Sequence, residues 1–286
     1  EMCIRDRYED VQNMIATYGE GSPCLAFIGH TDVVPPGDLS KWKSDPYSLI
    51  HDDGMLIGRG TADMKGGIAC FMSAVREFFE DGNSIKGSIK FILTADEEGD
   101  AVNGIRKVID EDIFKDSDLD YCLVGEPSSS TEIGDVIRNG RRGSITGHLT
   151  LHGVQGHVAY PEKADNPIHS CSEVLSNLLK IKFDNGNEFF PPTSFQVSNI
   201  NAGTGVDNVI PGDIKLSFNV RYSTETNSDQ IKDSIIDVIE SSNIKYDISW
   251  KHSGEPFLTT DEEFMNMCKE SIKDVTSIDT VVSTNG

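Results

Sequence analysis

Long apolar runs and an excess of basic residues are both missing from this 286-residue sequence. No stretch of about 18 consecutive apolar residues occurs, so we expect no transmembrane helix. The opening residues 1–7 lack the apolar core of a secretory signal. Lys and Arg number 25 against 47 Asp and Glu, a formal net charge of −22. Because nucleic acids and anionic membranes are bound by basic surfaces, we expect neither as a partner.

Cysteine is scattered, and the sequence contains no internal repeat and no low-complexity tract. None of the six cysteines forms a C-x-x-C pair. Cys24, Cys70, Cys122 and Cys171 lie inside apolar segments, as buried free thiols do. A cytoplasmic protein without structural disulfides is the simplest expectation.

Apolar strands alternate with amphipathic helices in the first half of the chain. Continuous apolar runs predict buried strands over residues 23–29, 88–94 and 120–124. Asp53-Gly54 between apolar flanks predicts a hairpin over residues 49–58. Helical spacing predicts helices over 66–80 and 103–109. This order predicts an α/β fold with a mostly parallel sheet.

A second pattern begins near residue 142. Alternation over residues 145–152 predicts a half-exposed strand. It is followed by a helix over 167–180, strands over 193–201 and 213–222, a helix over 228–241 and a strand over 245–250. The order β-α-β-β-α-β is that of a ferredoxin-like domain. Because a helical pattern returns after residue 256, we predict that residues 143–256 are inserted into a catalytic domain of residues 1–142 and 257–286.

Acidic residues and one histidine follow the predicted strands of the first layer. They are His30, Asp32, Asp63, Glu97, Glu98 and Glu126. Ligands of open α/β sheets bind beyond the carboxyl ends of the strands, so we expect these side chains in one crevice. Their mutual repulsion calls for a cation, and imidazole with carboxylates suits zinc. Singly, each has a plainer interpretation as a surface pair, a helix cap or a turn. Their coincidence at successive strand ends favours metal.

The same motifs, in this order, resemble the M20 family of zinc peptidases and amidohydrolases from about Tyr8 onward. They are G-H-T-D-V-V-P, G-R-G-T-A-D-M-K-G-G, T-A-D-E-E-G and V-G-E-P-S-S-S. The resemblance implies a catalytic α/β domain, a ferredoxin-like lid that forms a homodimer, and two Zn²⁺ per subunit, with cobalt as a possible substitute. It also implies the role of each residue. His30 and Glu126 would hold one zinc and Glu98 the other. Asp63 would bridge them, Glu97 would be the general base, and Asp32 would orient His30.

Motifs in the second half resemble the branch of this family that hydrolyses N-succinyl-LL-2,6-diaminopimelate, a small anionic amide. They occupy residues 138–144, 153–161, 165–169, 189–194 and 205–211. The resemblance implies that His157 enters the partner subunit's active site to stabilise an oxyanion. The implied substrate contacts are Arg141, Ser144, Tyr160, Asn208 and Arg221.

Two alternatives stay open. One is an amidohydrolase of the acetylornithine deacetylase or aminoacylase type, and the other is a zinc-binding homologue that has lost catalysis. In the resembling enzymes a Gly-Thr-Ser-Asp-Gly loop and a last zinc-ligand histidine follow the point where this sequence stops. We therefore expect this sequence to be truncated at both ends. We also expect it to hold about one zinc on its own and to be inactive, because the second site has too few ligands.

Overall fold

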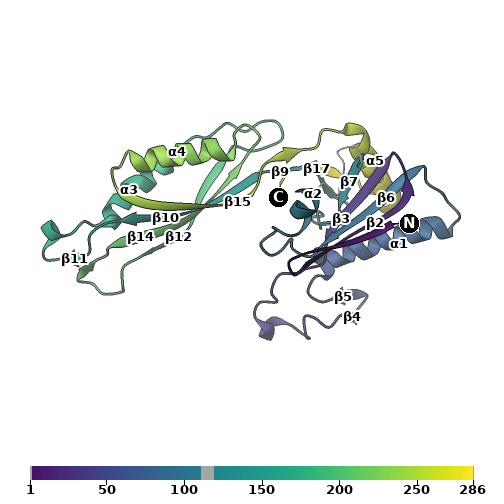
Figure 1. Ribbon diagram of the computed structural model, residues 1–286, viewed down its shortest axis with the longest axis horizontal. Helices are drawn as coiled ribbons and strands as arrows, with labels where there is room; N and C mark the ends of the chain where they lie inside the picture. The colour runs from purple at the N-terminus through teal and green to yellow at the C-terminus, as the bar shows by residue number, and fades with distance from the viewer. Residues whose placement is uncertain (1, 111–118, 286) are drawn as a thin grey trace. The chain divides into compact units, whose positions relative to one another are not determined.

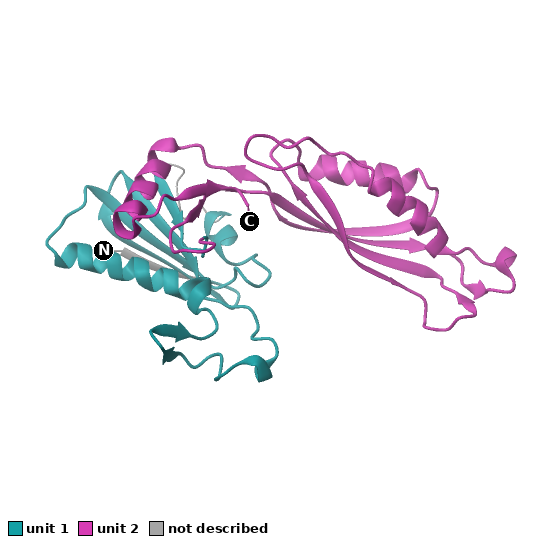
Figure 2. Cartoon of the chain, turned by 180° about the vertical axis from the view of Figure 1, so that it is seen from behind, with its two compact units in different colours: residues 1–128 teal, residues 129–286 magenta. Residues whose placement is uncertain are grey.

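The chain forms two compact units, residues 1–128 and residues 129–286, called unit 1 and unit 2 here (Figure 2). The computed structural model describes residues 2–110 and 119–285. None of the helices in those ranges has the length and apolar character that crossing a membrane requires.

Unit 1 is built on a five-stranded sheet with the order β1-β2-β6-β3-β7 (Figure 1). The strands are β1 (Met2–Tyr8), β2 (Val11–Glu20), β3 (Cys24–His30), β6 (Gly87–Thr94) and β7 (Tyr121–Val124). β3 pairs in parallel with β6 and β7, as predicted. β1 and β2 form an antiparallel hairpin on β6 that was not predicted. The sheet is therefore mixed, and the predicted parallel arrangement holds for β3, β6 and β7 but not for the added hairpin.

Successive strand residues point to opposite sides of the sheet, and a separate buried cluster lies on each side of β3. Phe27 belongs to a cluster with Met64 and Ile68, and its ring stacks on Phe71 of α1 (Gly66–Glu80) at 4.3 Å. The neighbouring Ala26 lies in a second cluster with Ile15, Ile92 and Val108 of α2 (Ile105–Asp110). Parallel strands covered on both faces read as continuous apolar runs, which explains why β3 and β6 were predictable.

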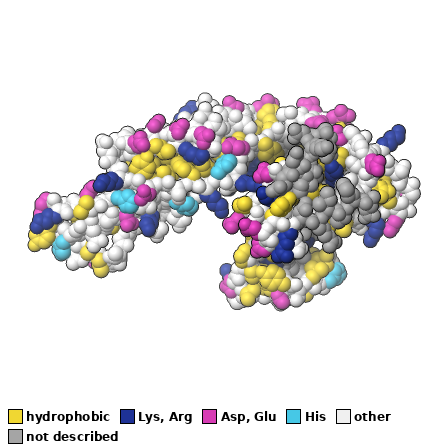
Figure 3. Space-filling view, viewed as in Figure 1, with side chains coloured by type: hydrophobic (Ala, Val, Ile, Leu, Met, Phe, Trp, Pro, Cys, Tyr) yellow, Lys and Arg dark blue, Asp and Glu magenta, His cyan; other side chains and the backbone are white. Residues whose placement is uncertain are grey.

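The remaining elements of unit 1 lie between β3 and α1. They are η1 (Leu39–Lys41), β4 (Ile50–Asp52), β5 (Met55–Ile57) and the π-helical turn η2 (Thr61–Lys65). Asp53 and Gly54 have φ values of 45° and 76°, so the predicted hairpin turn is confirmed. Apolar side chains gather on the hairpin surface, where Tyr47, Leu49 and Met55 are exposed (Figure 3).

Unit 2 contains a four-stranded antiparallel sheet with the order β12-β14-β10-β15. Its elements run β10 (Gly143–His152), α3 (Pro167–Leu178), β12 (Ser194–Ala202), β14 (Asp213–Tyr222), α4 (Ser228–Glu240) and β15 (Lys245–Gly254). This is the predicted element order. Leu149, Phe218 and Ile231 lie in one buried cluster. This cluster fills the space between one face of the sheet and the two helices. The helices lie on one side of the sheet (Figure 1), and the alternating polar residues of β10 and β14 point to the other.

Shorter elements complete unit 2. β11 (Gly156–His157) pairs with β13 (Val209–Ile210), β9 (Gly140–Arg141) with β16 (Phe257–Leu258), and β8 (Val136–Arg138) with β17 (Val281–Ser283). The turn η3 (Pro161–Lys163) and helix α5 (Glu262–Thr276) also belong to it. The short pairs were not predicted, because two or three residues carry too little periodicity.

The cysteine predictions hold only in part. Cys24 and Cys171 are buried free thiols, as expected, but Cys70 and Cys122 are exposed. Cys70 lies on α1, and Cys122 lies on β7 at the edge of the sheet. An apolar neighbourhood in sequence therefore did not imply burial for these two residues.

Candidate metal centre

His30 is the last residue of β3, and its side chain is only 2% exposed. Nδ1 donates a hydrogen bond to the backbone carbonyl of Asp32 at 3.0 Å. Because a carbonyl only accepts, this bond places a proton on Nδ1, and Nε2 is the ring nitrogen left for a metal. Nε2 lies 3.0 Å from Asp63 Oδ1 and 3.2 Å from Glu126 Oε1. The imidazole and two carboxylates thus converge on one point at the carboxyl end of the strand.

Asp63 reaches this point from η2, where its backbone is extended (φ −122°, ψ 101°) and that of Met64 also departs from helical geometry. The next side chain, Met64, is fully buried, and its sulfur accepts the backbone N–H of His30 at 3.2 Å. This contact holds the turn against the end of β3. Asp63 does not cap α1, because the N-cap position is Lys65 and no side chain bonds there. The helix-cap interpretation of Asp63 is therefore wrong.

Glu97 and Glu98 follow β6, and Asp32 ties their loop to the end of β3. Asp32 Oδ2 accepts the backbone N–H of Glu97 at 3.0 Å and that of Glu98 at 2.8 Å. Asp32 Oδ1 lies 3.6 Å from His30 Nδ1, farther than the Asp32 backbone carbonyl, which accepts the hydrogen bond at 3.0 Å. The residue contacts the imidazole mainly through its backbone. Sequence reasoning missed its second role, as an acceptor for the glutamate loop.

These side chains form two groups that could hold a cation. One is His30 with Asp63 and Glu126, and the other is His30 with Glu97 and Glu98; within each, the ligand atoms lie within 4.8 Å of one another. Here Glu98 groups with His30 and Glu97, whereas the resemblance pairs it with Asp63.

The electrostatics of the cluster favour a bound cation. Burial, and then the charge of Asp63, raise the pKa of Glu126 to about 7. Burial, and then Asp63 and Glu97, also raise the pKa of Glu98. Burial lowers the pKa of His30, but its bond to Asp32 and the charge of Glu126 outweigh this and raise it. Crowded carboxylates of this kind are relieved by a divalent cation, and this donor set fits zinc.

The candidate residues of unit 2 separate into two groups. His157, Tyr160 and Asn208 gather around β11. Val158 donates its N–H to the carbonyl of Asn208 at 3.1 Å, and the rings of His157 and Tyr160 lie 5.8 Å apart. His157 Nδ1 accepts the N–H of Ala159 at 3.1 Å, which leaves Nε2 for another partner.

Ser144, Arg221 and Arg141 lie toward the opposite end of the same sheet. Ser144 on β10 faces Arg221 on β14, and Arg141 is paired with Phe257 in β9. His152, where β10 ends, lies eight positions after Ser144, a span of about 27 Å. β11 lies beyond that far end (Figure 1). One small molecule therefore cannot contact both groups of a single chain.

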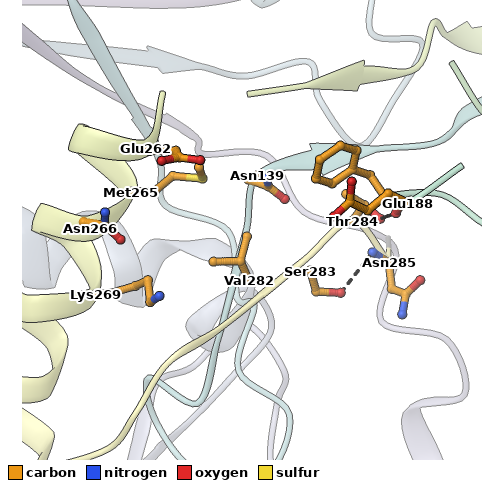
Figure 4. A pocket seen from close by; sticks show the side chains of 11 residues that line it. Asn139, Glu188, Glu262, Met265, Asn266, Lys269, Val282, Ser283, Thr284 and Asn285 are labelled. Atoms are coloured by element: carbon orange, nitrogen blue, oxygen red, sulfur yellow. Dashed lines mark hydrogen bonds between the residues drawn. The ribbon is translucent and has the colours of Figure 1, made fainter. Parts of the chain in front are cut away.

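Unit 2 also contains a cavity of about 610 Å³ that none of the predicted site residues lines (Figure 4). Its walls include Asn139, Glu188, Glu262 and Lys269. Neither of the two metal-binding groups found among the described residues lies in the wall of this cavity.

Known proteins of similar sequence match nearly the whole chain. The chain is 48% identical over 279 residues to a succinyl-diaminopimelate desuccinylase of Shewanella piezotolerans, covering 98% of this chain and 73% of the relative. It is 49% identical over 280 residues to the same enzyme of Acinetobacter baylyi, covering 98% and 74%.

Solved structures share the fold at low sequence identity. An M20 metallo-carboxypeptidase from Sulfolobus solfataricus superposes with a TM-score of 0.83 at 15% identity, covering 99% of this chain and 77% of that one. A dinuclear metal-binding M20 peptidase from Bacillus subtilis gives 0.64 at 14% identity, covering 96% and 69%. Residues 26–286 match the family model itself. The chain belongs to peptidase family M20/M25/M40.

Proposed function

We propose that this protein hydrolyses the amide of N-succinyl-LL-2,6-diaminopimelate to succinate and LL-2,6-diaminopimelate. The observation that carries the proposal is the convergence of His30, Asp63 and Glu126 in a chain 48% identical to a desuccinylase over 98% of its length. The reaction serves the bacterial synthesis of diaminopimelate and lysine. The alternative is an acetylornithine deacetylase or aminoacylase activity. The substrate assay described below distinguishes the two.

In the complete gene product, the carboxylate cluster would take part in holding a pair of zinc ions. His30 and Glu126 would bind one ion, Glu98 the other, and Asp63 would bridge them. When bound, zinc polarises an amide carbonyl and acidifies water. The protein contributes the fixed tautomer of His30 through the Asp32 carbonyl, and it keeps this ligand 2% exposed. Both features set the direction of Nε2 before a metal arrives.

Glu97 would be the general base. Its backbone N–H is held by Asp32, while its side chain is exposed to the space where substrate would enter. A carboxylate in this position takes a proton from the attacking water and delivers it to the leaving amine nitrogen. The released diaminopimelate amine then leaves protonated, and succinate leaves as its carboxylate.

Residues 143–256 would form a ferredoxin-like lid that pairs with its copy across a two-fold axis. What supports this is the distance of about 27 Å along β10 between its two groups of candidate residues. In a dimer, one chain would supply Arg141, Ser144 and Arg221 for the substrate carboxylates. Its partner would supply the group around β11, in which His157 would stabilise the oxyanion.

Turnover by the complete gene product tests the proposal. We expect hydrolysis of N-succinyl-LL-2,6-diaminopimelate, and at least about 100-fold lower kcat/KM for N-acetylornithine and N-acetylated amino acids. Glu97→Gln serves as the inactive control. Preference for the acetylated substrates would move the protein to the alternative branch. No turnover of any amide by metal-loaded protein would support the binding homologue that has lost catalysis.

A further inference from the structure

Asn219 lies on β14 two residues before Arg221, and both side chains occupy the polar face of the unit 2 sheet. Its carboxamide is at the centre of a hydrogen-bond network. Nδ2 donates to Ser144 Oγ at 3.1 Å, to Thr146 Oγ1 at 3.0 Å and to the carbonyl of Ile145 at 3.3 Å. Oδ1 accepts the Nε–H of Arg221 at 3.1 Å.

The partners fix the direction of this carboxamide. A guanidinium can only donate, and the carbonyl of Ile145 can only accept. Turning the amide over would place NH₂ against the Arg221 N–H and oxygen against the carbonyl, so both contacts would become repulsive. Asn219 thus has one orientation, and it transmits that orientation to Arg221.

The bond has a consequence for the free edge of Arg221. The guanidinium is a planar fork, so fixing Nε–H fixes the plane in which the two Nη groups lie. The side chain is exposed, and among the described residues no carboxylate lies within ion-pair distance of it. Its Nη edge is therefore available to a carboxylate from outside the chain, which this geometry accepts in a bidentate manner.

Ser144 is controlled by the same amide. Its hydroxyl oxygen accepts from Asn219, so its proton remains available to donate to a second acceptor. Ser144 stands opposite Arg221 in the strand register, and it is 5% exposed. The Asn219 side chain thus bonds to both Arg221 and Ser144 and holds these two donors in place.

We propose that Asn219 is a positioning residue for substrate binding, which holds the Arg221 guanidinium and the Ser144 hydroxyl ready for one carboxylate of the acyl amino acid. This inference rests on the proposed function. Without Asn219, Arg221 keeps its charge but must be ordered by each substrate molecule that binds, and that ordering costs affinity.

The test is a kinetic double-mutant cycle in the complete gene product, using N-succinyl-LL-2,6-diaminopimelate. Asn219→Leu keeps the side-chain volume and removes the hydrogen bonds. We expect its KM to rise about tenfold with kcat within about twofold of wild type. The reason is that the charged hydrogen bond that orders the Arg221 side chain is lost. Arg221→Ala should raise KM further, and Asn219→Leu/Arg221→Ala should be no worse than Arg221→Ala alone.

Gln196 provides the matched control, because it faces Asn219 from the neighbouring strand β12 and is exposed. Gln196→Ala should leave KM and kcat unchanged. If Asn219→Leu fails to fold, as judged by its melting temperature, Asn219→Ala takes its place in the cycle. An Asn219 effect that falls on kcat, or that adds fully to Arg221→Ala, would overturn the inference. Absence of turnover by the wild-type enzyme would instead overturn the proposed function.

Discussion

Asp32 is not a predicted metal ligand, yet replacing it with alanine should weaken metal binding. Asp32 Oδ2 accepts two backbone N–H groups, those of Glu97 and Glu98, at 3.0 and 2.8 Å. Each hydrogen bond to a charged acceptor contributes about 1.5–3 kcal/mol. Water replaces part of this at the exposed Glu97, so we expect a net loss of about 2–3 kcal/mol. That corresponds to roughly 30- to 150-fold weaker zinc binding if loop order is needed to bind metal.

The assay is a competition titration of zinc against a chromophoric chelator, using the complete gene product. Asp32→Asn keeps an oxygen for both N–H groups but loses the charge, so its affinity should fall by only about tenfold. Asp38→Ala is the matched control, because Asp38 also accepts a backbone N–H, that of Ser40, but in a separate loop. Wild-type zinc affinity in Asp32→Ala would refute the reasoning, since the glutamate loop would then be ordered without this carboxylate.

Three further predictions concern the base, the dimer and the core. Glu97→Gln should retain zinc by elemental analysis yet lose at least about 100-fold in kcat; a parallel loss of zinc would make Glu97 a ligand. Mixing His157→Ala with Glu97→Gln chains should restore some activity through hybrid dimers, and failure after proven subunit exchange would exclude a site shared between subunits. Ile231→Ala, at a fully buried position, should lower the free energy of unfolding by about 2–5 kcal/mol in urea. The exposed control Ile133→Ala should change it by less than about 0.5 kcal/mol.

Periodicity predicted the elements wherever one side of an element is buried against another layer. α1 spans Gly66–Glu80 as predicted, because one of its faces packs on the sheet. β14 likewise has its predicted bounds, Asp213–Tyr222, with alternate residues buried under the helices. β1 and β2 were not predicted. In β2 only Asn13 and Ile15 are buried, so its position on the sheet comes from pairing with β6 and not from a strong apolar alternation.

The residues of the candidate metal centre could be predicted from the sequence, but the contacts that hold them in place could not. A strand-end rule needs only the order of strands and the residues after them, and it indicated His30 after β3 and Glu126 after β7. The Asp32 contacts depend on how two loops fold back on each other, which no periodicity encodes. The Asn219 network depends on strand register. A shift of one residue between β10 and β14 would turn Asn219 toward the helices. Burial of Phe218 and Val220 on the helix side opposes that shift, so the same packing that stabilises unit 2 also orients Arg221.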